Sequence, residues 1–99
     1  GPATAISVTP NVTLPSHVGT PITWTATASG GTATPLQYKF YLYTQGSGWS
    51  LLQDYGPNET FTWTPTVAGT YQVQVWVRSA GSTQAYESFT QTMLFVIQP

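Results

Sequence analysis

The sequence predicts an all-β domain, an antiparallel two-sheet sandwich of about seven strands without a disulfide. Three observations predict it: apolar and polar residues alternate with period two in segment after segment, these segments are rich in Thr, Val, Tyr, Phe and Trp, and Gly, Pro or Asn separates them. Helical periodicity is weak throughout, so the crossover helices that a parallel sheet requires are not expected. The 99 residues suit one domain with one two-layer core.

The first half of the chain predicts a split first strand and two longer ones. Residues 5–8 and an edge segment at 12–14 form the split strand, interrupted by Pro10. Residues 21–29 alternate cleanly and direct Trp24 to one face. Residues 36–44 direct Tyr38 and Phe40 inward, so the opposite face of that strand is unusually aromatic.

The second half predicts four more strands. A Gly-rich turn at 45–48 leads into residues 49–55, and residues 59–64 follow with Trp63 facing inward. Residues 69–79 alternate most clearly, and we expect this strand to be central. The register of the last strand, residues 86–97, is left open, because Phe89, Met93, Phe95 and Ile97 compete with Leu94 and Val96 for the core, and a bulge would reconcile them. The predicted core residues are Trp24, Tyr38, Phe40, Trp63, Tyr71, Val73 and Val75.

Two stretches carry a resemblance to known families. Residues 67–75, VAGTYQVQV, resemble the Gly-x-Tyr-x-Val run that begins the sixth strand of many bacterial immunoglobulin-like and PKD-like domains. Residues 35–42, PLQYKFYL, together with Trp49 and FTWTP at 61–65, are similar to the triple-tyrosine modules of bacterial sensor proteins and to repeats of large secreted bacterial proteins. The resemblance implies an immunoglobulin-like sandwich in which Tyr71 forms a tyrosine corner. It leaves the function open.

Composition excludes several classes of partner and chemistry. Without cysteine, the chain has neither a disulfide nor a thiolate metal site, and we expect aromatic burial to replace the inter-sheet crosslink of antibody-type domains. A net charge of −1 with only 5% charged residues argues against nucleic acid as a partner. No apolar run approaches the roughly 20 residues that span a bilayer, so no membrane insertion is expected.

The setting and the domain limits follow from the same composition. Uncharged polar residues and the bacterial resemblance predict an extracellular, cell-surface or periplasmic location. We interpret Gly1 and Pro2 as a cloning remnant and residues 3–98 as one domain. Its ends are expected at opposite poles of the sandwich, so that copies could be joined in tandem.

No catalytic site is predicted. A Ser-His-Asp arrangement would need His17 and Asp54, the only residues of their types, and nothing in their spacing brings them together. Asp54, Glu59 and Glu87 are scattered carboxylates, so at most a weak Ca²⁺ site beside the 54–59 turn stays open, and no metal or cofactor is expected. An isopeptide bond from Lys39 is not expected on a solvated face, and the alternating threonines fit ordinary β-propensity better than ice binding.

The aromatic outer face is the one candidate binding surface. Tyr41 and Tyr43 should lie beside Trp76 if their strands pair, Trp49 could extend the patch, and Lys39 and Arg78 flank it. The alternative is cross-strand packing with both cations lying over the rings. As a ligand, a protein ranks above a polysaccharide, because the sequence predicts no amide cluster that would orient a sugar.

The sequence therefore predicts a non-catalytic module that spaces or docks neighbouring domains of a larger parent chain. The alternative is a carbohydrate- or protein-binding module that uses the aromatic face. A third role, a sensory domain that passes strain to a kinase, depends on sequence outside this chain.

Overall fold

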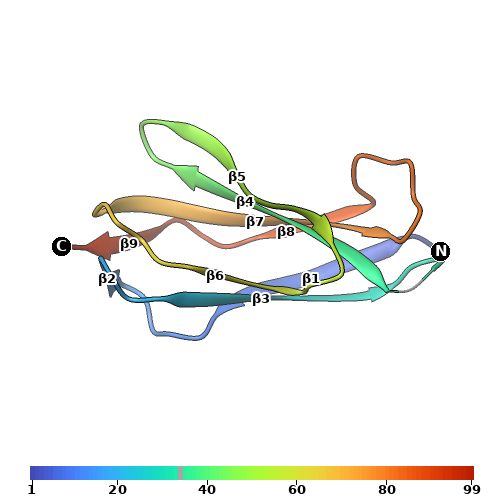
Figure 1. The fold of residues 1–99 in the computed structure, drawn as a ribbon, viewed down its shortest axis with the longest axis horizontal. Coiled ribbons are helices and arrows are strands. Elements are labelled where there is room, and N and C mark those ends of the chain that lie inside the picture. Colours follow the sequence, from blue (N-terminus) through green and yellow to red (C-terminus); the bar gives the residue numbers. More distant parts are fainter. Residues whose placement is uncertain (34) are drawn as a thin grey trace.

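A computed structural model describes residues 1–33 and 35–99 and confirms the predicted all-β sandwich (Figure 1). A three-stranded sheet has the order β1-β3-β6, and a six-stranded sheet has the order β2-β9-β7-β4-β5, with β8 also paired to β7. Within the described residues no helix has the length and apolarity to cross a membrane. The strands are β1 (Ala3–Pro10), β2 (Ser16–His17), β3 (Ile22–Gly30), β4 (Leu36–Thr44), β5 (Gly48–Gly56), β6 (Thr60–Trp63), β7 (Gly69–Ser79), β8 (Ser88–Gln91) and β9 (Phe95–Gln98).

The N-terminal part differs from the sequence prediction. β1 is longer than expected, and it bulges between Ala5 and Ser7. The predicted edge strand at 12–14 is wrong: Val12 and Leu14 pack against the core without joining a ladder. The short strand lies instead just after Pro15, where β2 pairs in parallel with β9.

The core lies between the two sheets, where alternate residues of β3, β4 and β7 point inward. Trp24 and Phe40 are both 0% exposed. Trp63 packs against this core but stays half-buried, because β6 is the edge strand of the smaller sheet. The other buried apolar residues are Ala3, Val8, Ile22, Ala26, Tyr38, Leu42, Tyr71, Val73, Val75, Val77, Phe95 and Ile97.

The last predicted strand is divided into two. β8 pairs with Gln74–Val77 and β9 with Gly69–Tyr71, both on the same side of β7. Between them Thr92 donates its backbone N–H to Val73 O and accepts from Val73 N–H on its hydroxyl. This break settles the register: Phe95 and Ile97 are buried, whereas the other candidates, Phe89, Met93, Leu94 and Val96, are exposed.

The chain ends lie at opposite poles of the molecule, as Figure 1 shows. The domain is elongated, with extents of 43 × 24 × 18 Å, and its long axis follows the strands. The chain therefore enters near one pole and leaves near the other.

Candidate binding face

The outer face of the six-stranded sheet gathers the aromatic residues that do not enter the core. Pairing of β4 with β7 sets Tyr41 opposite Gln74 and Lys39 opposite Trp76. β5 adds Trp49 opposite Tyr43, and β8 adds Phe89 opposite Trp76. Because directly opposed residues point to the same side of a sheet, all of these side chains share one surface. We call it the outer aromatic face; its rings are Tyr41, Tyr43, Trp49, Trp76, Tyr86 and Phe89.

The rings form two adjoining clusters. In one, Trp76 lies between Tyr41 and Tyr86, with centroid distances of 4.9 and 4.7 Å, and Phe89 meets Tyr86 edge-on at 6.0 Å. In the other, Tyr43 and Trp49 are 5.3 Å apart. Trp49 and Phe89 are each 49% exposed and Tyr86 is 43% exposed. The face therefore offers a large area of aromatic surface to solvent, more contiguous than is usual for isolated surface rings.

A hollow of about 340 Å³ separates the two clusters and is lined by Tyr41, Trp49, Gln74 and Trp76. The Gln74 amide is fixed from both ends: its Oε1 accepts from Trp76 Nε1 and its Nε2 donates to Gln91 Oε1, each at 2.8 Å. The hollow thus has three ring walls and one oriented amide.

The Lys39 ammonium lies among the rings at one side of this face. Its Nζ is 3.6 Å from Asp54 Oδ1 and within 5.3 to 5.6 Å of the ring centroids of Tyr41, Tyr55 and Trp76. A hydrogen bond to Tyr41 and the charge of Asp54 raise the Lys39 pKa. The Tyr55 backbone N–H and the ammonium together lower the pKa of Asp54. The lysine is held as a cation against aromatic faces.

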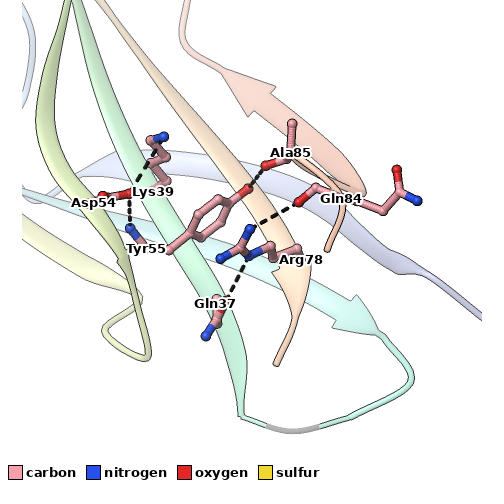
Figure 2. Close-up of polar contacts among 7 residues, drawn as sticks. All are labelled: Gln37, Lys39, Asp54, Tyr55, Arg78, Gln84 and Ala85. Atoms are coloured by element: carbon pink, nitrogen blue, oxygen red, sulfur yellow. Dashed lines mark hydrogen bonds and ion pairs between the residues drawn. The ribbon is translucent and has the colours of Figure 1, made fainter. Parts of the chain in front are cut away.

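Arg78 and Tyr55 clamp the β7–β8 loop onto β5 (Figure 2). The Arg78 guanidinium stacks on the Tyr55 ring at 3.9 Å and donates to Gln37 Oε1 and Gln84 O. Tyr55 Oη donates to Ala85 O at 2.7 Å, and burial raises the Tyr55 pKa to about 12. Both cations of the chain are therefore engaged by neighbouring residues, in the arrangement that cross-strand packing predicts.

The remaining candidate residues stay apart. His17 and Asp54 lie on β2 and β5, the opposite edge strands of the six-stranded sheet. Asp54, Glu59 and Glu87 do not converge, and the described residues hold no group of three or more His, Asp or Glu side chains that could bind a metal. Thr23 Oγ1 and Thr62 Oγ1 share a hydrogen bond of 2.8 Å across two strands of the smaller sheet.

Glu87 instead connects strands. Its Oε1 accepts from Ala3 N, Ser79 N and Ser79 Oγ at 2.8 to 2.9 Å, which joins the start of β1 to the end of β7. These hydrogen bonds, the Ala3 N–H first among them, lower the pKa of Glu87 from 4.5 to about 2. The carboxylate has a structural role in this position.

Residues 22–98 match the Y_Y_Y domain family. The chain belongs to this family. Comparisons with curated proteins and with solved structures gave no match. The match confirms the resemblance to triple-tyrosine modules, while the likeness to PKD-like domains stays a prediction. In this Y_Y_Y domain Tyr71 has a buried ring, and its hydroxyl donates to Val67 O, which is the tyrosine corner that the resemblance implies.

Sequence reasoning missed three residues of the outer aromatic face and its surroundings. Phe89 lies opposite Trp76, but this could not be read while the register of the last strand was open. Tyr86 was predicted to begin the last strand, but that start is wrong: Tyr86 lies in the loop before β8 and reaches Trp76 only through the fold. Tyr55 lies near the end of β5, beyond the irregularity in its pairing with β4, where alternation no longer indicates the face.

Proposed function

We propose that this Y_Y_Y domain is a non-catalytic spacer and docking module of a larger bacterial surface, secreted or periplasmic protein. The observation that carries the proposal is the position of the chain ends at opposite poles of a domain 43 Å long (Figure 1). A polypeptide that passes through such a domain advances by most of its length, so neighbouring domains of the parent chain are held apart.

The two terminal strands are both fixed to β7, which supports this role. At one pole Glu87 accepts hydrogen bonds from Ala3 N and Ser79 N, and Ala5 N donates to Ser88 Oγ. At the other pole β9 pairs with Gly69–Tyr71 of the same strand. β1 also pairs with β3 from Ala3 to Pro10, so both ends of the chain are held by strand pairing or hydrogen bonds to the body of the sandwich.

Two copies of residues 3–98 joined end to end would test the spacer role. Small-angle X-ray scattering should give a maximum dimension close to twice the 43 Å of one domain. A matched pair joined through a long Gly-Ser linker gives the dimension expected for freely moving domains. If the directly joined pair has a maximum dimension near that of one domain, the copies fold back on each other and the proposal fails.

The second candidate is a binding module that uses the outer aromatic face for a protein or a polysaccharide. The observation that favours it is the hollow between exposed rings, lined by Tyr41, Trp49, Gln74 and Trp76. Binding that is lost in Trp49→Ala at an unchanged melting temperature would support this candidate. The two roles are compatible, because the outer aromatic face lies on strands that run along the length of the domain, whereas the chain ends lie at its poles (Figure 1).

A further inference from the structure

We propose that the hollow lined by Tyr41, Trp49, Gln74 and Trp76 is a subsite for a neutral polysaccharide chain. This inference rests on the binding role of the outer aromatic face and is independent of the spacer role. Three properties of the hollow specify the ligand: its ring walls, its oriented amide and its lack of an available cation.

The walls suit a sugar ring. Sugars present C–H groups on their ring faces, and these pack against the electron-rich faces of aromatic rings. The rings of Tyr41 and Trp76 are inclined at 53°, as are those of Tyr43 and Trp49, so the surface is hollowed rather than flat. Trp49 stands on the edge strand β5, half-exposed, and is accessible to a ligand of any length.

The amides supply direction, which aromatic rings alone do not. Gln74 is held by Trp76 Nε1 and by Gln91, so its position is fixed before any ligand arrives. Gln91 is exposed and uses its Oε1 in that bond, which leaves its Nε2 to donate to a sugar hydroxyl. Gln72 donates to Thr92 O and keeps its Oε1 as an acceptor. Groups ordered in advance reduce the entropic cost of binding.

The state of the cations specifies a neutral ligand. The chain has one Lys and one Arg, Lys39 and Arg78. Lys39 is paired with Asp54 against three rings, and Arg78 is stacked on Tyr55 and hydrogen-bonded to Gln37 and Gln84 O. An anionic polysaccharide would have to break these contacts to find a counter-charge. A neutral one leaves them intact.

The extent of the face favours a polymer over a single sugar. From β5 across β4 and β7 to β8 there are three strand spacings, roughly 14 Å at about 4.8 Å each. Rings continue in this direction from Trp49 to Trp76 and on to Tyr86 and Phe89. A chain that crosses the strands can therefore contact both ring clusters, whereas a monosaccharide contacts only the hollow.

Affinity electrophoresis of the domain in native gels tests the proposal. Each gel contains one of five neutral polymers: mixed-linkage β-glucan, xyloglucan, arabinoxylan, galactomannan or amylopectin. A further gel contains polygalacturonate, an anionic polysaccharide, for comparison. At least one neutral polymer should retard the domain, and Trp49→Ala should weaken that binding about tenfold or more. Gln74→Ala should weaken it as well. Val67→Ala, which removes an exposed apolar side chain from the loop between β6 and β7, is the matched control and should bind as the parent chain does.

Three outcomes would overturn the proposal. One is no retardation by any of the five neutral polymers, and another is retardation by polygalacturonate alone. The third is self-association that sedimentation shows to depend on Trp49, because the occupant would then be a second copy of the chain. The first two outcomes leave the scattering of the end-to-end pair unchanged. For the third, the pair is measured with Trp49→Ala in both copies, so the spacer role is judged separately.

Discussion

Replacement of Trp24 by alanine tests the packing that takes the place of a disulfide in this fold. Trp24 is 0% exposed at the centre of β3, and its ring lies 5.2 Å from that of Phe95 in the facing sheet. Removal of a fully buried Trp costs about 3 to 5 kcal/mol. A domain of this size has about 5 to 15 kcal/mol of stability, so the melting temperature should fall by roughly 12 to 40 °C.

Trp24→Phe separates the ring from its polar atom. Trp24 Nε1 is buried and has no hydrogen-bond partner among residues 1–33 and 35–99. An unpaired buried donor costs about 1 to 3 kcal/mol. Phenylalanine keeps most of the aromatic contact with Phe95 and removes that cost, so Trp24→Phe should lie within about 1.5 kcal/mol of the parent chain.

Urea unfolding followed by far-ultraviolet circular dichroism measures both variants without relying on tryptophan fluorescence. Val96→Ala, at an exposed site, is the control and should change the free energy of unfolding by less than about 0.5 kcal/mol. A loss below about 1 kcal/mol in Trp24→Ala would refute the placement of this residue. Equal losses in the Ala and Phe variants would contradict the expectation that removal of the unpaired indole N–H offsets the smaller ring of Phe.

Three further predictions concern single polar contacts. Tyr71→Phe removes the hydrogen bond to Val67 O and should lower the free energy of unfolding in urea by about 0.5 to 1.5 kcal/mol. An unchanged urea midpoint would show that the tyrosine corner does not stabilise the fold. The Glu87 pKa is lowered from 4.5 to about 2, so this carboxylate stabilises the fold above pH 4.5 and loses that effect as pH falls toward 2. Between pH 4.5 and 2 the melting temperature of Glu87→Gln should accordingly fall less than that of the parent chain. Identical dependence of the melting temperature on pH in the two proteins would contradict the stabilising role of the Glu87 carboxylate. Tyr55→Phe removes the bond to Ala85 O and should accelerate amide hydrogen exchange around residues 83–87 while β3 keeps its protection.

The sequence predicted the fold where strands are long and alternate cleanly. β3, β4 and β7 lie close to their predicted limits, because their inward residues can be buried only if each strand keeps a strict period of two. Prediction failed where contacts with distant segments determine whether a residue joins a strand. The segment around Pro15 became β2 only because β9 offers an edge, and the break at Thr92 depends on its two bonds to Val73.

The candidate site was predictable in its centre and not at its margins. The juxtaposition of Tyr41 and Trp76 follows from alternation on two paired strands. Tyr86 could not be found, because a loop residue reaches the face only through the bonds that Arg78 and Tyr55 make to Gln84 and Ala85. The amide pair of Gln74 and Gln91 required the register of β8, which the sequence left open.

Cross-strand NOE spectroscopy of β4 against β7 tests the central claim most directly. The account predicts Hα–Hα cross peaks at alternate pairs of the register that runs from Leu36 with Ser79 to Thr44 with Tyr71, together with contacts between the Tyr41 and Trp76 rings. Cross peaks displaced by one residue would contradict it. Such a shift would turn Tyr41 toward the core and Phe40 toward solvent, and the outer aromatic face would not exist.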